Sequence, residues 1–159
     1  FERNMDDDMI KLLGKNNGVI CINFGSTFLD GKLRKKQDED REKLSGILTE
    51  KGLEASDSLA EPIIEQFKKD NPRLFSDVEM VANHIDHVVK LAGIDHVGLG
   101  SDFDGVGDSL PVGLKDVSQF PNLVKVLLQR GYSEEDIAKI CYQNVFRVWS
   151  EVEKVAASM

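Results

Sequence analysis

The chain has 159 residues, of which 41% are hydrophobic and 30% are charged, and its formal net charge is −8. A chain of this length can bury one ordinary hydrophobic core. Its acidity argues against a nucleic-acid surface, and no apolar run approaches the ~20 residues that a membrane-spanning helix needs.

The amino-terminal part of the chain predicts a helix followed by a buried strand. Residues 6–16 have an aspartate at their start and an apolar stripe at helical spacing, and Asn16-Asn17-Gly18 ends the pattern. Residues 18–24 are almost continuously apolar, which is typical of a parallel strand covered on both faces. Cys21 lies in this strand and is therefore expected to be buried.

A highly charged segment follows this strand. Lysines and arginines alternate with acidic residues over 30–56, which indicates a solvated, partly helical surface segment. Residues 59–67 predict another short helix, which Asn71-Pro72 ends. We expect these segments to form a charged helical excursion at about 30–72.

The remaining half alternates again between helix and strand. Ser76 is expected to cap a long helix that Gly93 ends, and a strand over 96–101 follows. Two carboxy-terminal helices are predicted, over 121–130 and from a Ser133 cap to about Val155, with Cys141 facing inward in the second.

This order of elements predicts an α/β fold with parallel strands. Two strands cannot close a sheet, and a (β/α)₈ barrel usually takes ~250 residues. Residues 1–159 are therefore expected to be part of a larger domain. The two cysteines lie far apart, so the sequence predicts no disulfide framework and leaves the redox compartment undetermined.

Asp102 is the strongest candidate for a functional residue. It directly follows the apolar strand and would be the first polar side chain at the carboxyl end of the sheet, where α/β barrels carry their chemistry. Asp104-Gly105 is interpreted as a turn. For Asp102 the pattern leaves two interpretations open, which are a functional carboxylate and a residue of the same turn.

The histidines and Arg3 have weaker functional signals. His84 and His87 lie three residues apart on one helical face and could share a metal, but no Glu or Cys completes a ligand set. We interpret them as structural histidines bonded to neighbours, and His96 lies at the wrong end of its strand for catalysis. Arg3 by itself is interpreted as a surface ion pair, although a guanidinium at a strand end could bind a carboxylate bidentately.

Four segments resemble the carboxy-terminal half of the membrane (renal-type) dipeptidases, the zinc-dependent M19 peptidases. The first is Arg3-Asn4-Met5-Asp6-Asp7, which matches the family's Arg-Asn-x-x-Asp. The second is the strand Gly18 to Phe24. The third combines His84-Ile85-Asp86-His87 with residues 93–105, and the fourth begins at Pro111 and runs through Pro121-Asn122-Leu123.

The resemblance implies the carboxy-terminal part of a single TIM-like (β/α)₈ barrel domain that hydrolyses dipeptides. It implies a pair of Zn²⁺ ions at the carboxyl face of the barrel, with ligands on earlier strands, upstream of this chain. Asp102 resembles the active-site aspartate that assists proton transfer or binds the substrate amino end, and Arg3 resembles the arginine that holds the substrate carboxylate. The implied partners are a dipeptide and the remaining amino-terminal part of the barrel. Relatives are often homodimers, but the sequence marks no partner face.

The chain departs from the family pattern in two places. The charged excursion is long, which implies different substrate access, and Tyr142-Gln143-Asn144 replaces the usual Gly-Gly-Asn, which we expect to affect helix packing. Two alternative functions are an amidohydrolase-type barrel acting on another amide and a catalytically inactive barrel that serves as a binding module. A substrate panel of dipeptides and cyclic amides would distinguish the first alternative from a dipeptidase. The zinc content of the intact protein would distinguish the second.

Overall fold

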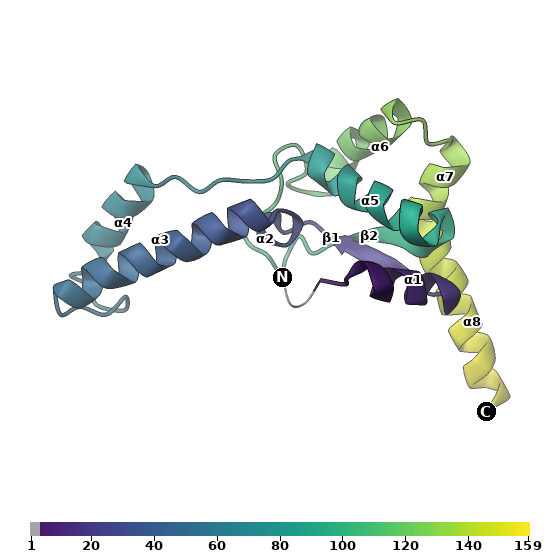
Figure 1. Cartoon of the computed structure of the whole chain (residues 1–159), viewed down its shortest axis with the longest axis horizontal. Coiled ribbons are helices and arrows are strands. Elements are labelled where there is room, and N and C mark those ends of the chain that lie inside the picture. The colour runs from purple at the N-terminus through teal and green to yellow at the C-terminus, as the bar shows by residue number, and fades with distance from the viewer. Residues whose placement is uncertain (1–3) are drawn as a thin grey trace.

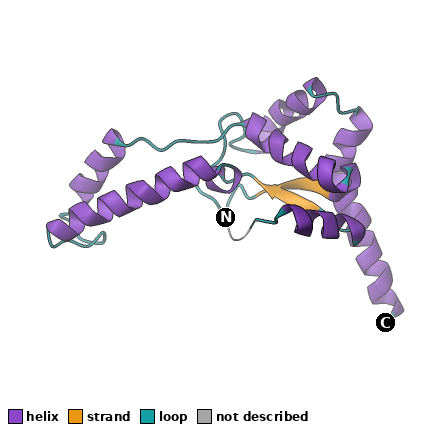
Figure 2. Cartoon of the chain, viewed as in Figure 1, coloured by secondary structure: helices purple, strands orange, loops and turns teal. Residues whose placement is uncertain are grey.

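A computed structural model describes residues 4–159 of the chain, so Arg3 lies outside the described residues. Within that range, β1 (Ile20–Asn23) and β2 (Val97–Ser101) pair in parallel, as predicted. Helices pack around this pair, and two further helices extend away from it (Figures 1 and 2).

The helical elements account for most of the chain. In chain order they are α1 (Asp7–Lys15), α2 (Ser26–Leu29), α3 (Gly31–Glu50), α4 (Glu61–Asp70), α5 (Val78–Ala92), the 3₁₀ turn η1 (Ile94–His96), the 3₁₀ turn η2 (Val117–Gln119), α6 (Phe120–Gln129), α7 (Glu134–Ala138), the π-helical turn η3 (Lys139–Gln143) and α8 (Asn144–Ser158). None of the helices in the described range combines the length and apolar character needed to cross a bilayer.

Helix α5 forms the centre of the core. Its buried residues Val81, Ile85 and Val88 follow helical spacing and join Ile22 of β1 and Val97 of β2 in one apolar cluster. The helix also packs against α1 on one side and α6 on the other. This central position fixes the strands relative to the helices that precede and follow them.

The beginning of α5 differs from the predicted one by a residue. Asp77, and not Ser76, is the N-cap: its side chain accepts a hydrogen bond from the Met80 backbone N–H at 2.9 Å. Ser76 is buried, and its backbone N–H donates to Ser26 Oγ at 3.1 Å. Both residue types can cap a helix, and this tertiary hydrogen bond decides between them.

The predicted burial of both cysteines is wrong. Cys21 and Cys141 are exposed. In β1 the side chain of Ile22 is buried and Ile20 packs on the same core, whereas Cys21 lies between them. Because successive strand side chains point to opposite faces, covering one face leaves Cys21 open to solvent.

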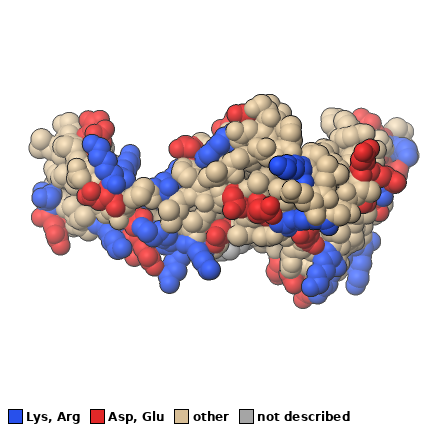
Figure 3. All heavy atoms as spheres, turned by 90° about the horizontal axis from the view of Figure 1, so that it is seen from above, with Lys and Arg blue, Asp and Glu red and all other residues tan. Residues whose placement is uncertain are grey.

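Helices α3 and α4 form an arm that projects from the body of the molecule (Figure 1). The arm carries interspersed positive and negative side chains (Figure 3). Several of its ion pairs join side chains one helical turn apart, such as Arg34 with Asp38 at 2.8 Å and Lys35 with Glu39 at 3.9 Å. The arm is thus stabilised in part by interactions within its own helices.

The last helical run changes its hydrogen-bonding pattern at η3. This π-helical turn connects α7 directly to α8. Ile140 and Asn144 are buried, while the three residues between them are exposed. Ser133 caps α7 and forms a capping box with Asp136, so the predicted start of this run is confirmed.

Candidate active site

The carboxyl ends of the two strands are joined across a β-bulge. Ile22 pairs with Leu99, but Asn23 pairs with Ser101, so Gly100 is the extra residue of β2. A Cβ atom on Gly100 would lie 2.9 Å from the Cys21 carbonyl oxygen. Glycine therefore permits the bulge, and the bulge brings Ser101 level with Asn23.

Beyond the bulge the backbone takes an unusual course. Ser101 and Asp102 have φ angles of 50° and 68°, in the left-handed region. Such residues cost of order 1–3 kcal/mol each and persist where the surroundings fix them. Here the Phe24 backbone N–H donates to the Ser101 carbonyl oxygen at 3.0 Å. The prediction that Asp102 directly follows the strand is confirmed.

The carboxylate of Asp102 is held by one hydrogen bond and lies in space that a glycine leaves open. Asn23 Nδ2 donates to Asp102 Oδ2 at 2.7 Å, and Asn23 Oδ1 accepts from the Gly25 backbone N–H at 2.7 Å. A Cβ atom on Gly105 would lie only 2.0 Å from Asp102 Oδ1. The turn glycine thus leaves the space that the carboxylate occupies.

The segment after Asp102 is anchored to α2 and to the start of α5. Ser26 donates its backbone N–H to the Ser109 carbonyl at 2.8 Å and accepts from Ser76 at its hydroxyl. The Val112 backbone N–H donates to the Ser76 carbonyl at 2.8 Å. These bonds join three segments distant in sequence, so the loop has a defined path.

Three aromatic rings pack together just beyond the carboxyl ends of the strands and at the start of α6. Phe24 lies edge-on to Phe103 and Phe120 with centroid distances of 5.9 and 6.2 Å, and Phe103 lies 5.6 Å from Phe120. Edge-to-face contacts of this kind add to the stability gained from apolar burial. They connect the end of β1 with the residue that follows Asp102.

A cavity of about 280 Å³ lies beside the end of β1 and is lined in part by Asn4, Asn23 and His84. Asn4 Nδ2 donates to the Phe28 carbonyl oxygen at 2.9 Å. Asn23 therefore lines this cavity and also contacts Asp102. The substrate-binding role of Arg3 stays a prediction, because that residue lies outside the described range.

The histidines bond to neighbours, as interpreted from the sequence. His84 Nε2 lies 2.8 Å from the Leu29 carbonyl, His87 Nε2 lies 2.8 Å from Asp7 Oδ1, and His96 Nδ1 lies 2.8 Å from the Gly18 carbonyl; these atom pairs are hydrogen-bonded. Among residues 4–159, no group of three or more His, Cys, Asp or Glu side chains could hold a metal ion. The described residues alone do not fit a metal centre.

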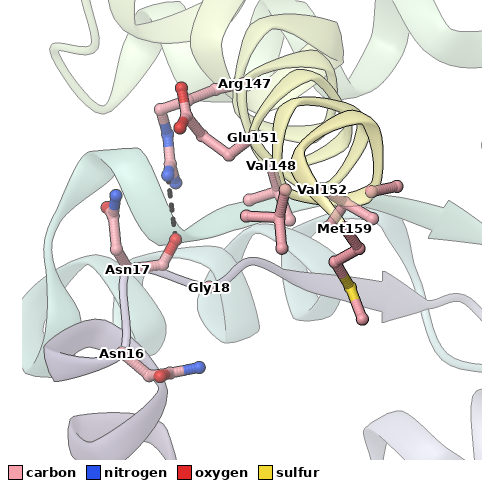
Figure 4. Close-up of a pocket in the computed structure, with 10 residues that line it drawn as sticks. Asn16, Asn17, Gly18, Arg147, Val148, Glu151, Val152 and Met159 are labelled. Carbon is pink, nitrogen blue, oxygen red and sulfur yellow. Dashed lines mark hydrogen bonds between the residues drawn. The ribbon is translucent and has the colours of Figure 1, made fainter.

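The opposite end of the strand pair holds a larger groove of about 550 Å³, between α8 and the turn before β1 (Figure 4). Arg147 donates to the carbonyl oxygens of Asn17 and Asp95 at 2.8 and 2.7 Å. Most of the other α8 residues that line it are apolar, including Val148 and Val152. The NH1 and NH2 groups of Arg147 in this groove are thus engaged with backbone carbonyl oxygens.

Sequence reasoning missed Asn23 and the packing role of Gly105. The rule that selected Asp102, a polar residue at the end of an apolar strand, applies equally to Asn23 and could have found it. Asp104-Gly105 was interpreted as a turn, and the Gly105 backbone N–H does donate to the Asp102 carbonyl at 3.2 Å. The close approach to the carboxylate depends on three-dimensional placement.

Comparison with known proteins defines the class of this chain. The family model described as membrane dipeptidase (peptidase family M19) matches residues 1–159. The chain therefore belongs to the membrane dipeptidase family, as its motifs suggested.

Curated relatives agree with this assignment. The chain is 54% identical over 81 residues to dipeptidase tcpJ of Claviceps purpurea, which covers 51% of this chain and 19% of that protein. It is 32% identical over 159 residues to the uncharacterized dipeptidase C965.12 of Schizosaccharomyces pombe, covering 99% of this chain and 29% of that protein. The chain thus spans less than a third of the length of either relative.

Solved structures give the same result. The probable dipeptidase PvdM from Pseudomonas aeruginosa has a TM-score of 0.67 and 29% identity, over 97% of this chain and 42% of that one. A metallopeptidase from Rhodobacter sphaeroides, liganded with a phosphinate mimic of the dipeptide L-Ala-D-Ala, has a TM-score of 0.60 and 26% identity, over 91% of this chain and 30% of that one.

Proposed function

We propose that the protein containing this chain is a metal-dependent dipeptidase. The observation that carries the proposal is Asp102, held on left-handed backbone at the carboxyl edge of two parallel strands in a chain of the M19 family. The Rhodobacter relative binds a dipeptide mimic, which supports a dipeptide as the substrate class.

In this proposal, residues 1–159 form the carboxy-terminal part of a TIM-like barrel. The parallel pair of β1 and β2, with helices packed against it, is consistent with two adjacent barrel strands. We assign the ligands of two zinc ions to parts of the barrel outside residues 1–159. Zinc bound there would supply polarisation of a carbonyl group and activation of water.

The roles proposed for this chain concern the substrate and its protons. The Asp102 carboxylate accepts a hydrogen bond from the substrate amino end or receives a proton during hydrolysis. Arg3 binds the substrate carboxylate through its guanidinium group. The two side chains then recognise opposite ends of a short peptide, which explains a preference for dipeptides.

The test uses the full-length enzyme and its Asp102→Asn variant, which keeps the shape of the side chain but removes its charge. We expect dipeptide turnover to fall by roughly 10²- to 10⁴-fold, the usual contribution of a positioned acid or base. Zinc content and thermal unfolding serve as controls for folding. Turnover within a few-fold of the parent, or hydrolysis of cyclic amides but not of dipeptides, would overturn the proposal.

A further inference from the structure

We propose that Asn23 is a positioning residue that sets the orientation of the Asp102 carboxylate. The inference rests on the proposed function, because it assigns a role to a neighbour of Asp102. Its basis is the hydrogen bond of 2.7 Å from Asn23 Nδ2 to Asp102 Oδ2, which joins residues 79 positions apart in the sequence.

The orientation of the Asn23 amide is determined by its other contact. A backbone N–H can only donate, so the Asn23 atom that lies 2.7 Å from the Gly25 nitrogen must be the amide oxygen. The NH₂ group is then directed toward Asp102. The short segment from Asn23 to Gly25 therefore fixes a hydrogen-bond donor and not an acceptor at the carboxylate.

This donor restricts what Asp102 can do. The amide NH₂ of Asn23 has no acceptor capacity, so Asp102 Oδ2 must act as the acceptor in this contact. The other oxygen, Oδ1, lies against Gly105, where a side chain would collide with it. Asn23 thus orients the carboxylate through Oδ2, and Gly105 leaves the space that Oδ1 occupies.

The bulge makes this contact possible. Because Gly100 is left unpaired, Asn23 pairs with Ser101 and Asp102 follows immediately on a left-handed backbone. In a regular ladder Asn23 would instead pair with Gly100. Asn23 also lines the cavity beside β1.

The test compares Asn23→Ala and Asn23→Asp in the full-length enzyme. We expect Asn23→Ala to lower kcat roughly 10- to 100-fold with a smaller change in KM, since small misplacements of reacting groups cost up to about 10²-fold. Asn23→Asp is isosteric and keeps the acceptor for Gly25, but it sets two carboxylates against each other. We expect a larger loss from this variant than from Asn23→Ala.

A double-mutant cycle separates positioning from a structural role. In the Asp102→Asn background, adding Asn23→Ala should lower kcat no further, because Asn23 acts through Asp102. The exchange variant Asn23→Asp/Asp102→Asn can restore a hydrogen bond between the strands, but it moves the carboxylate to β1. We expect it to recover thermal stability and not turnover.

The outcomes distinguish this inference from the proposed function. Full activity of Asp102→Asn would overturn the proposed function. Two results would overturn only the role of Asn23. The first is loss of activity in Asp102→Asn together with parental kcat in Asn23→Ala, and the second is recovered turnover in the exchange variant. If Asn23→Ala does not fold, Asn23→Ser retains a donor and is measured instead, with parental kcat counting against strict positioning by the longer amide. As a control, Asn71→Ala removes the hydrogen bond from the Asn71 side-chain amide to the Phe67 carbonyl oxygen at the end of α4. It should leave kcat unchanged.

Discussion

The two ends of the same strand pair are built in different ways. At the carboxyl end, Ser101 and Asp102 occupy left-handed backbone and a carboxylate is oriented by an amide from the neighbouring strand. At the amino end, Asn144 and Arg147 of α8 donate to backbone carbonyl oxygens. One end carries strain and a side chain with spare acceptor capacity, and the other end is cross-linked by hydrogen bonds.

This difference separates function from stability along one short element. Polar groups that only satisfy backbone partners stabilise the fold, whereas a fixed carboxylate remains available to a ligand. Substitutions at the amino end should therefore change mainly the free energy of unfolding. Substitutions at the carboxyl end should change mainly turnover.

The largest effect on stability is expected from Asn144→Ala. Asn144 is 2% exposed, and its Nδ2 donates to the carbonyl oxygens of Ile94 and Val97, each at 2.8 Å. Its loss leaves two carbonyl groups without this donor, at about 1–3 kcal/mol for each buried group left unpaired. Urea unfolding should show the lower free energy of unfolding. The control is Asn122→Ala, which removes one exposed hydrogen bond from a side-chain amide. Equal stability of the two variants would contradict the comparison.

In contrast to Asn144→Ala, Gly105→Ala should change mainly turnover and not the free energy of unfolding. The added methyl group would meet Asp102 Oδ1 at 2.0 Å, so the carboxylate must move. We expect kcat to fall roughly 10- to 100-fold with a much smaller change in the unfolding midpoint. Gly46→Ala is the matched control, because a Cβ there would meet no atom of residues 4–159 within 4 Å. Kinetics and unfolding of both variants provide the measurement, and an active Gly105→Ala enzyme would contradict the proposed packing.

A smaller effect is expected from the serines that anchor the loop after Asp102. Ser26→Ala removes the acceptor of the buried Ser76 backbone N–H and should cost about 1–3 kcal/mol. Among residues 4–159, the buried side-chain hydroxyl of Ser76 has no hydrogen-bond partner. Ser76→Ala should therefore be neutral or stabilising. If thermal unfolding ranked the two variants in the reverse order, the assigned role of Ser26 would be wrong.

The smallest effect is expected in the arm. Lys35 and Glu39 lie 3.9 Å apart, and the Lys35 side chain is 80% exposed. Exposed pairs of this kind contribute about 0.3–0.5 kcal/mol, so Lys35→Ala should change the free energy of unfolding only slightly. Denaturation at low and high salt checks this result. A loss as large as that of Asn144→Ala would show that the arm depends on more than local interactions.

The features that the sequence predicted correctly are those with a local signal. Apolar runs located the strands and α5, the capping pattern located the Ser133 cap, and the position of Asp102 followed from the end of its strand. The parallel arrangement of β1 and β2 followed from the alternation of elements. The catalytic role of Asp102 and the binding role of Arg3 remain predictions.

The features that could not be predicted depend on three-dimensional contacts. The hydrogen bond between Asn23 and Asp102 depends on the bulge at Gly100, and no periodic pattern in the sequence indicates that bulge. The choice of Asp77 over Ser76 as a cap depends on a hydrogen bond to Ser26. The exposure of Cys21 depends on which strand face the helices cover.

The π-helical turn between α7 and α8 has a consequence for changes in chain length. A turn closed by i→i+5 hydrogen bonds holds one residue more than an α-helical turn. The surplus lies on the exposed side, at Cys141, Tyr142 and Gln143, while Ile140 and Asn144 face the interior. Deleting one exposed residue would let the turn close as ordinary α-helix. Ile140 and Asn144 would both still face the interior. The turn is thus a point where this chain can lose one residue without changing how α8 contacts the strands.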